Sequence, residues 1–173
     1  MIRVMLAFLL SAAVMNAGVL LGARYGVLSQ SATYSGVKTN QKSMPGPGFM
    51  LGYDADSYRI IAVYDMFDGK DKSEANIASL GLHLIEQRDA EIRAFLGFDL
   101  GQLSYRHSSP LHTKSDNFGV YGVSVGIVLL DERFPGAQLE LGGQYMRTSN
   151  GKNENLDLDD VFQYYVRLNF DLW

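Results

Sequence analysis

Residues 105–112, Tyr-Arg-His-Ser-Ser-Pro-Leu-His, hold the densest group of reactive side chains in the sequence. Two histidines and two serines lie in this segment and Asp116 follows it, so a serine–histidine–carboxylate triad or a zinc site could be drawn from these residues. The spacing is that of a loop, and residue types alone do not supply the geometry that either site needs. We expect neither catalysis nor metal binding here. His83, which stands apart from this segment, is expected to be a hydrogen-bonded interior residue.

Other polar stretches carry weaker chemical signals. Residues 153–160, Asn-Glu-Asn-Leu-Asp-Leu-Asp-Asp, are acidic enough to attract calcium, but they lack the glycine and the oxygen spacing of an EF-hand loop. Residues 68–72 are typical of a turn with mixed charge. The chain has no cysteine, which excludes disulfides and thiolate metal sites. We therefore expect no catalytic residue, no metal and no cofactor.

The elements that must position these residues are strands. Residues 162–173 alternate large apolar and polar side chains without a break, which indicates a long strand with one apolar face. Most of the stretches with this alternation have the roughly nine to eleven residues that a tilted strand needs to cross a bilayer. Pro45 and Pro47 are expected at the entry to the second stretch, and Pro110 and Pro135 in connections. The eight stretches are residues 19–28, 48–54, 58–67, 76–85, 91–104, 118–129, 137–147 and 162–173.

The connections between these stretches alternate between long and short. Residues 29–47, 68–75, 105–117 and 148–161 form the long links, and residues 55–57, 86–90 and 131–136 form the short ones. Outer-membrane barrels have long external loops and short periplasmic turns, and closing the sheet leaves no edge. All the lysines fall in the long links, where we expect them to contact the phosphates of lipopolysaccharide. They are Lys38, Lys42, Lys70, Lys72, Lys114 and Lys152.

The two faces of the stretches differ in kind. One face of the last six is almost purely apolar, whereas the opposite face carries glycines, serines and charges. Glycine weakens an exposed strand, but inside an eight-stranded barrel it makes room for large neighbours. Buried charges persist only when they are paired, so we expect an interior network of ion pairs rather than an open channel. Its expected members are Arg24, Asp54, Arg59, Asp65, His83, Arg93, Asp99, Glu140, Arg167 and Asp171.

The N-terminus has a different pattern. Arg3 supplies a positive start, residues 4–14 are apolar, and Ala17 offers a small-residue cleavage position, as in a secretory signal peptide. We expect a signal peptide at residues 1–17 and one barrel domain at residues 18–173. A net charge of −4 and the lack of a basic, aromatic-interleaved patch argue against nucleic-acid binding.

This arrangement resembles the small eight-stranded outer-membrane barrels of the OmpA/OmpX type. The resemblance covers nearly the whole mature chain and rests on architecture. Its sharpest part is residues 162–173, which resemble the C-terminal insertion signal read by the barrel-assembly machinery; here the apolar series ends at Leu172, and Trp173 is one step out of phase. The resemblance implies an all-β, eight-stranded, antiparallel up-and-down transmembrane barrel in the bacterial outer membrane, with a plugged interior.

A second, local resemblance concerns Arg147-Thr148-Ser149-Asn150. It resembles the His-x-Ser-Asn motif of the lipid A 3-O-deacylase barrels, in which histidine activates serine and a later carboxylate orients the histidine. Ser149 and Asn150 match, and Asp159 or Asp160 could supply the carboxylate. Arg147 occupies the base position, however, and a protonated guanidinium cannot accept the serine proton. These residues are therefore interpreted as the start of a loop.

We expect a non-enzymatic outer-membrane barrel, porin-like in architecture, whose loops contact lipopolysaccharide, other surfaces or host molecules. Two alternatives within this fold are a lipid A-modifying enzyme of the deacylase kind and a narrow pore. A third is a soluble, lipocalin-like barrel, which would turn its apolar face inward around a ligand cavity.

Overall fold

The computed structural model describes residues 18–34, 37–39, 43–55, 57–69, 73–86, 91–108, 113–130, 136–149 and 156–172. In these residues the strands are β1 (Gly18–Tyr34), β2 (Val37–Thr39), β3 (Met44–Asp54), β4 (Tyr58–Asp68), β5 (Ser73–Ile85), β6 (Ile92–Ser108), β7 (Thr113–Leu130), β8 (Ala137–Thr148) and β9 (Leu156–Asp171). No helix of this described part has both the length and the apolar character required to cross a membrane. The signal peptide expected at residues 1–17 lies outside the described residues.

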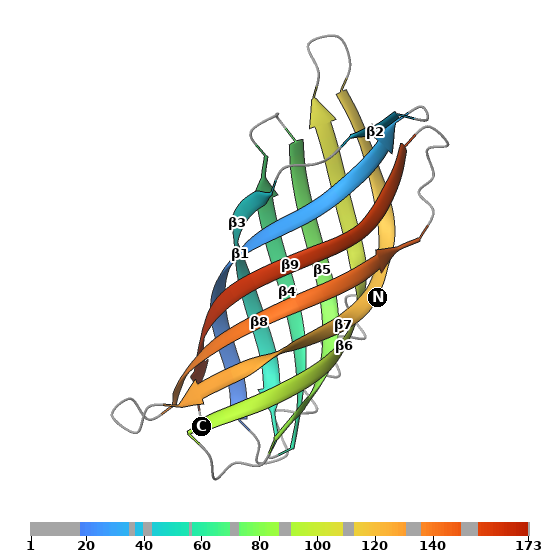
Figure 1. The fold of residues 1–173 in the computed structure, drawn as a ribbon. Coiled ribbons are helices and arrows are strands. Elements are labelled where there is room, and N and C mark those ends of the chain that lie inside the picture. The colour runs from blue at the N-terminus through green and yellow to red at the C-terminus, as the bar shows by residue number, and fades with distance from the viewer. Residues whose placement is uncertain are drawn as a thin grey trace, which may run out of the picture.

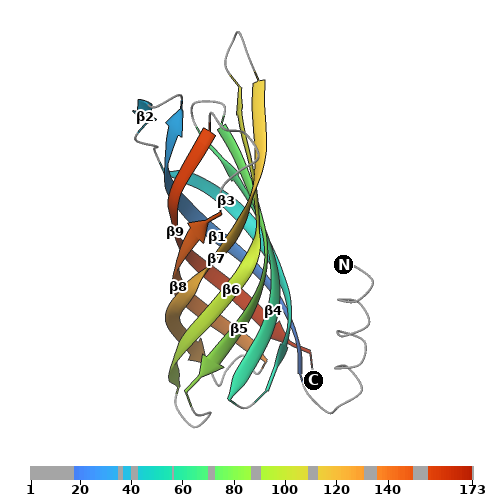
Figure 2. The same ribbon diagram turned by 90° about the vertical axis from the view of Figure 1, so that its right-hand side faces the viewer.

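Eight of the strands form a closed antiparallel barrel (Figure 1 and Figure 2). Each strand from β3 to β9 pairs with the next, and β1 closes the wall by pairing with both β3 and β9. The short strand β2 is an addition that pairs only with the end of β1. The expected all-β, up-and-down, eight-stranded barrel is confirmed.

The strands are longer than expected at one end of the barrel. This end, here called the loop end, carries the links from β1 to β3, β4 to β5, β6 to β7 and β8 to β9; the turn end carries the other links. Strand β6 continues to Ser108 instead of residue 104, β7 begins at Thr113 instead of 118, and β9 begins at Leu156 instead of 162. Only four residues separate β4 from β5 and β6 from β7, fewer than in two of the turn-end links, so the expected strict alternation of long and short links is wrong.

The two prolines of the second stretch also lie differently from the prediction. Pro45 and Pro47 are inside β3, where they stay in register with Val27 and Tyr25 of β1. The register of β3 with β4 begins only at Gly48. Because proline has no N–H to donate, the loop-end part of β3 keeps its pairing on one side alone.

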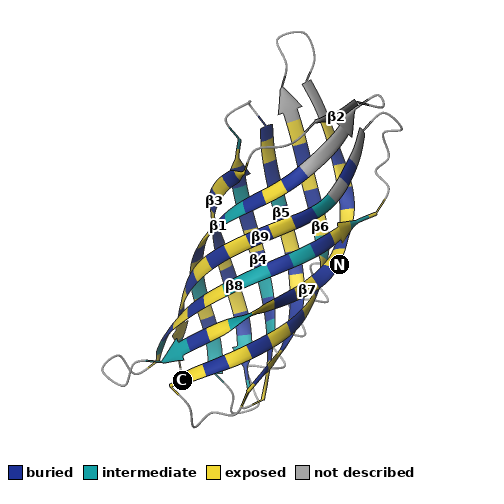
Figure 3. Cartoon of the chain, in the orientation of Figure 1, coloured by how far each residue is buried: buried dark blue, intermediate teal, exposed yellow. Residues whose placement is uncertain are grey.

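Buried and exposed side chains alternate along every strand of the barrel wall (Figure 3). The chemical character of the two faces changes place along β6: Leu100 faces outward and Asp99 inward, but further on Leu103 and Tyr105 face inward and Arg106 outward. Nearer the turn end the barrel is thus apolar outside, and nearer the loop end it is polar outside. We call the position of this change the exchange level; below it means toward the turn end, and above it means toward the loop end. On the outer face it lies between Asn76 and Ala78 of β5, between Leu100 and Gln102 of β6, and between Gly119 and Tyr121 of β7.

Candidate functional site: the barrel interior and its rim

The interior below the exchange level holds a group of charged side chains beside two small apolar clusters. The structure places nine of the ten residues expected there in the lumen with their side chains almost fully buried, and the tenth, Asp171, is half-buried near the turn end. Four of the buried residues are arginines and four are carboxylates, so their formal charges cancel if His83 is neutral. The nine are Arg24, Asp54, Arg59, Asp65, His83, Arg93, Asp99, Glu140 and Arg167.

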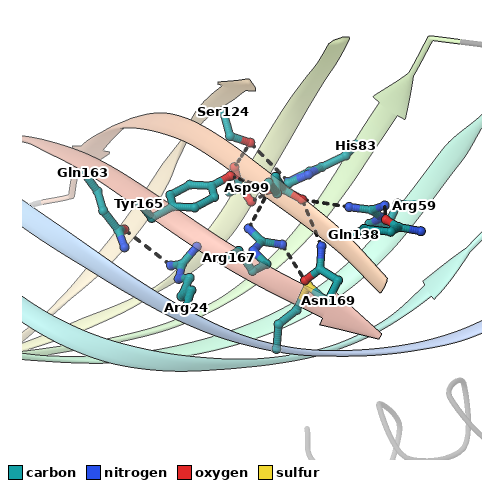
Figure 4. A network of polar contacts seen from close by, with 12 residues as sticks. Arg24, Arg59, His83, Asp99, Ser124, Gln138, Gln163, Tyr165, Arg167 and Asn169 are labelled. Carbon is teal, nitrogen blue, oxygen red and sulfur yellow. Dashed lines mark hydrogen bonds and ion pairs between the residues drawn. The ribbon is translucent and has the colours of Figure 1, made fainter. Parts of the chain in front are cut away.

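Glu140 of β8 is the centre of this network. Figure 4 labels the four side chains that contact it, which are Arg59, Tyr165, Arg167 and Asn169. The Glu140 carboxylate, which has no exposed surface, forms ion pairs with Arg59 Nη1 at 2.8 Å and Arg167 Nη2 at 3.1 Å. The Tyr165 hydroxyl donates to the same carboxylate at 2.9 Å, and the Asn169 amide donates at 3.4 Å. Strands β4, β8 and β9 are therefore connected across the lumen through one side chain.

A second ion pair lies beside the first. Arg24 of β1 makes a two-pronged contact with Asp65 of β4, and the Gln163 amide donates to Asp65 at 3.3 Å. The guanidinium groups of Arg24 and Arg167 each lie 4.8 Å from the centre of the Tyr165 ring, within the range of cation–π attraction. Tyr165 thereby joins the two ion-pair groups, a role that the sequence reasoning did not assign to it.

His83, Asp99 and Ser124 also meet inside the barrel, although Ser124 was not among the expected site residues. The Ser124 hydroxyl donates to Asp99 at 2.7 Å, and His83 Nε2 lies 3.1 Å from Ser124 Oγ and 3.3 Å from Asp99 Oδ1. In a hydrolytic triad the serine and the carboxylate contact opposite nitrogens of the imidazole. Here both contact Nε2, all three side chains are buried, and the ring stacks on Phe95, so the group is a structural part of the interior.

The interior above the exchange level is apolar, whereas the sequence analysis expected a network of ion pairs in the lumen. Phe67, Leu103, Phe118 and Met146 are almost completely buried there. The sequence analysis did not assign these residues to the lumen, because it followed the inward face of each strand only where the outward face is apolar. The full cluster is Leu28, Met44, Phe67, Ala75, Ile77, Leu103, Tyr105, Phe118, Val120, Met146, Leu158 and Val161.

The deacylase-like segment does not form a catalytic arrangement among the described residues. Ser149 Oγ accepts a hydrogen bond from the Gly119 N–H at 3.0 Å, and the Ser149 N–H donates to the Gly119 carbonyl. Arg147 Nε lies 3.8 Å from Asp160, which also accepts from the Tyr145 hydroxyl. Asn150 and the side chain of Asp159 lie outside the described residues.

Several other sequence-level candidates fall only partly within the structure. The histidine and serine side chains of residues 105–112 lie outside it, as do Lys42, Lys70, Lys72 and Lys152 and the side chains of Lys38 and Lys114. The backbone of Lys38 is in β2, and that of Lys114 is in β7. Within the described residues, no three histidine or acidic side chains gather as metal ligands would.

Comparisons with solved structures place this fold among small outer-membrane barrels. Neisserial surface protein A has a TM-score of 0.70 and 12% identity over 89% of this chain and 97% of that chain. The attachment invasion locus protein Ail of Yersinia pestis has a TM-score of 0.58 and 11% identity, covering 91% and 100% of the two chains. The N-terminal barrel domain of Pseudomonas aeruginosa OprF has a TM-score of 0.57 and 10% identity, covering 86% and 97%.

The sequence itself matches no family model and no curated protein. The chain therefore shares its fold with eight-stranded outer-membrane barrels of the OmpA/OmpX type at low sequence identity.

Proposed function

We propose that this protein is an integral, non-enzymatic barrel of the bacterial outer membrane that acts through its loop end and outer wall. The observation that carries the proposal is the exchange level. Below it, apolar side chains such as Leu82, Leu96 and Val125 face outward while charged side chains are buried inside. A water-soluble barrel has the opposite arrangement, so the lower wall suits contact with acyl chains and not with water.

The test is the behaviour of the protein in membranes. The cells' outer-membrane fraction is solubilised and run on a gel with and without boiling. A folded barrel migrates differently when unboiled, and we expect that shift in this fraction only. A protein recovered folded from the aqueous fraction without detergent would overturn the proposal and favour the lipocalin-like alternative.

The filled interior supports a closed barrel over the narrow-pore alternative. Buried ion pairs occupy the lower lumen, and the apolar cluster of Phe67, Phe118 and Met146 occupies the upper lumen. Water and ions are poorly accommodated by such an apolar layer. In planar bilayers we expect no steady conductance, whereas a steady conductance that changes on Arg93→Ala would support transport.

Arg147, which occupies the base position of the deacylase-like segment and cannot accept a proton, supports the non-enzymatic assignment. Incubating the purified barrel with lipid A should release no acyl chain. Release that is lost in Ser149→Ala would establish the deacylase-like alternative.

The remaining parts of the proposal concern partners. Export through the signal peptide, insertion by the barrel-assembly machinery through the last strand, and lysine contacts with lipopolysaccharide at the loop end fit an outer-membrane barrel. Loss of the protein from the outer membrane on removal of residues 162–173 would test the second of these.

A further inference from the structure

An outward-facing glycine interrupts the apolar wall of the barrel. Strand β8 presents Leu139, Leu141, Gly143, Tyr145 and Arg147 on its outer face, in order toward the loop end. Gly143 is paired with Val125 of β7 on one side and Tyr164 of β9 on the other. Both neighbours are well exposed, and the Tyr164 ring borders the place that a side chain at Gly143 would take. That place, between Val125 and the Tyr164 ring, is here called the Gly143 gap.

The packing of the barrel does not require glycine at this position. A Cβ atom built on Gly143 would meet the Tyr164 ring at 3.6 Å, an ordinary contact, and the backbone has no positive φ. By contrast, a Cβ on the inward Gly122 would lie 1.9 Å from the Tyr145 carbonyl oxygen, and one on Gly142 would lie 2.5 Å from the Tyr165 ring. Glycine weakens a strand, and the close contacts that exclude a side chain at Gly122 and Gly142 are not present at Gly143.

An outward arginine stands above the gap. Of the six arginines in the described part, four are buried in the lumen, and only Arg106 and Arg147 face outward. Arg147 lies at the exchange level, where it is paired with Tyr121 of β7. Its side chain is 62% exposed, and its nearest carboxylate, Asp160, is 3.8 Å away and also accepts from Tyr145. A guanidinium has five donors, so the Asp160 contact leaves capacity for an anion.

We propose that Arg147 and the Gly143 gap form a site for one phosphorylated lipid on the outer wall. A phosphate at the headgroup level accepts from the Arg147 guanidinium between the Tyr121 and Tyr145 rings. One acyl chain descends along β8 and fills the Gly143 gap between Val125 and Tyr164. The four residue steps from Arg147 to Gly143 span roughly 13 Å of strand, which matches a headgroup at the exchange level with its chain in the apolar band. The inference rests on the proposed outer-membrane function, in which the outer-leaflet source of such a lipid is the lipid A part of lipopolysaccharide.

The test measures lipid retention by the folded barrel purified in a neutral detergent. Diphosphorylated lipid A and its dephosphorylated form are titrated separately, and bound lipid is counted by native mass spectrometry. The variants are Arg147→Gln, which removes the charge, and Gly143→Val, which fills the gap. Arg106→Gln is the matched charge control, because Arg106 is also outward but lies beyond the exchange level beside Glu74. Ala62→Val on β4, which is on the opposite side of the eight-stranded ring, is the matched packing control.

We expect Arg147→Gln to weaken binding of diphosphorylated lipid A about tenfold, the usual effect of losing a charged hydrogen bond. Gly143→Val should weaken it by a similar factor while leaving the barrel at least as stable in detergent, because valine favours strands. Both control variants should bind diphosphorylated lipid A with an affinity within about twofold of the unaltered barrel. The unaltered barrel should bind the dephosphorylated lipid weakly, with about the affinity of Arg147→Gln for diphosphorylated lipid A.

Three results would overturn the site. They are unchanged binding in Arg147→Gln or Gly143→Val, an equal loss in Arg106→Gln, or a Gly143→Val barrel that unfolds more readily without lipid, which would give the glycine a structural role. Each can occur in a barrel that still shows the unboiled gel shift, in which case the outer-membrane assignment stands. Absence of that shift in the unaltered protein would contradict the proposed function before the lipid test begins.

Discussion

Removing the carboxylate of Glu140 should strongly destabilise the barrel. In Glu140→Ala, Arg167 loses the one acid with which it forms an ion pair in the described part, whereas Arg59 keeps Asp54 at 3.0 Å. Both guanidinium groups are almost completely buried, so water cannot replace the lost partner. Tyr165 also loses the acceptor for its hydroxyl.

The magnitude follows from the burial of these groups. Removing one member of a buried ion pair typically costs about 3–5 kcal/mol, because the other charge is left uncompensated in a medium of low dielectric. We expect a loss in this range for the free energy of unfolding of Glu140→Ala. The measurement is a urea titration of the barrel in lipid vesicles, with the folded fraction read from the mobility of unboiled samples.

Two further variants decide whether charge is the cause. Glu74→Gln removes a carboxylate that lies 3.6 Å from Arg106 on the exposed wall, and it should change the unfolding free energy by less than about 1 kcal/mol. The double variant Glu140→Leu with Arg167→Met removes both buried charges and should recover more than half of the loss. A Glu140→Ala barrel as stable as the original, or a double variant less stable than Glu140→Ala, would refute the reasoning.

Three other substitutions test the remaining layers of the barrel, each by the same urea titration. Leu141→Arg places a charge on the apolar outer face and should cost roughly 2–4 kcal/mol in vesicles, and stability equal to that of the original would contradict the membrane-facing assignment. Phe118→Ala opens a cavity in the apolar cluster above the exchange level and should cost about 3–5 kcal/mol, whereas a negligible loss would mean that this cluster is not a packed core. Gly122→Ala forces a Cβ against the Tyr145 carbonyl oxygen and should lower the urea midpoint, in contrast to Gly143→Val; equal midpoints for the two would contradict the packing argument.

The architecture could be predicted from the sequence because each strand repeats the same signal. Period-two alternation placed all eight wall strands, and the core of each expected stretch is strand in the structure. Pairing partners followed from the up-and-down order, and the inward position of residues such as Arg59 and Glu140 followed from parity alone. The contacts among them could not be predicted, because the meeting of Glu140, Arg59 and Arg167 depends on how strands far apart in sequence face each other across the lumen.

The strand ends were misplaced for a specific physical reason. Apolar residues were expected on the outer face throughout, and the expected stretches reach only a little beyond the point where that face becomes polar. On β6 the outer face is polar from Gln102, and the expected stretch ended at residue 104. The strand continues, because its inward residues Leu103 and Tyr105 become apolar at the same point and supply a different kind of core. Pro45 and Pro47 were expected before the strand, because proline has no backbone N–H to donate. Strand β3 nevertheless contains them, because this part of it pairs with β1 alone.

The exchange level also limits where this barrel can act. The lower lumen holds paired charges together with two small apolar clusters, and the upper lumen holds a larger apolar cluster. A change in either part of the lumen is costly to stability. The outer wall below the exchange level must remain apolar as long as it contacts acyl chains. Outward side chains of different chemical kinds are tolerated at the exchange level and beyond it toward the loop end, because the outer face there need not be apolar. Arg147 stands at that level, and Gly143 lies roughly 13 Å of strand from it toward the turn end. Each departs from what its place in the wall would otherwise favour. For these reasons the outer rim, and not the lumen, is the part of this molecule most suited to recognise a partner.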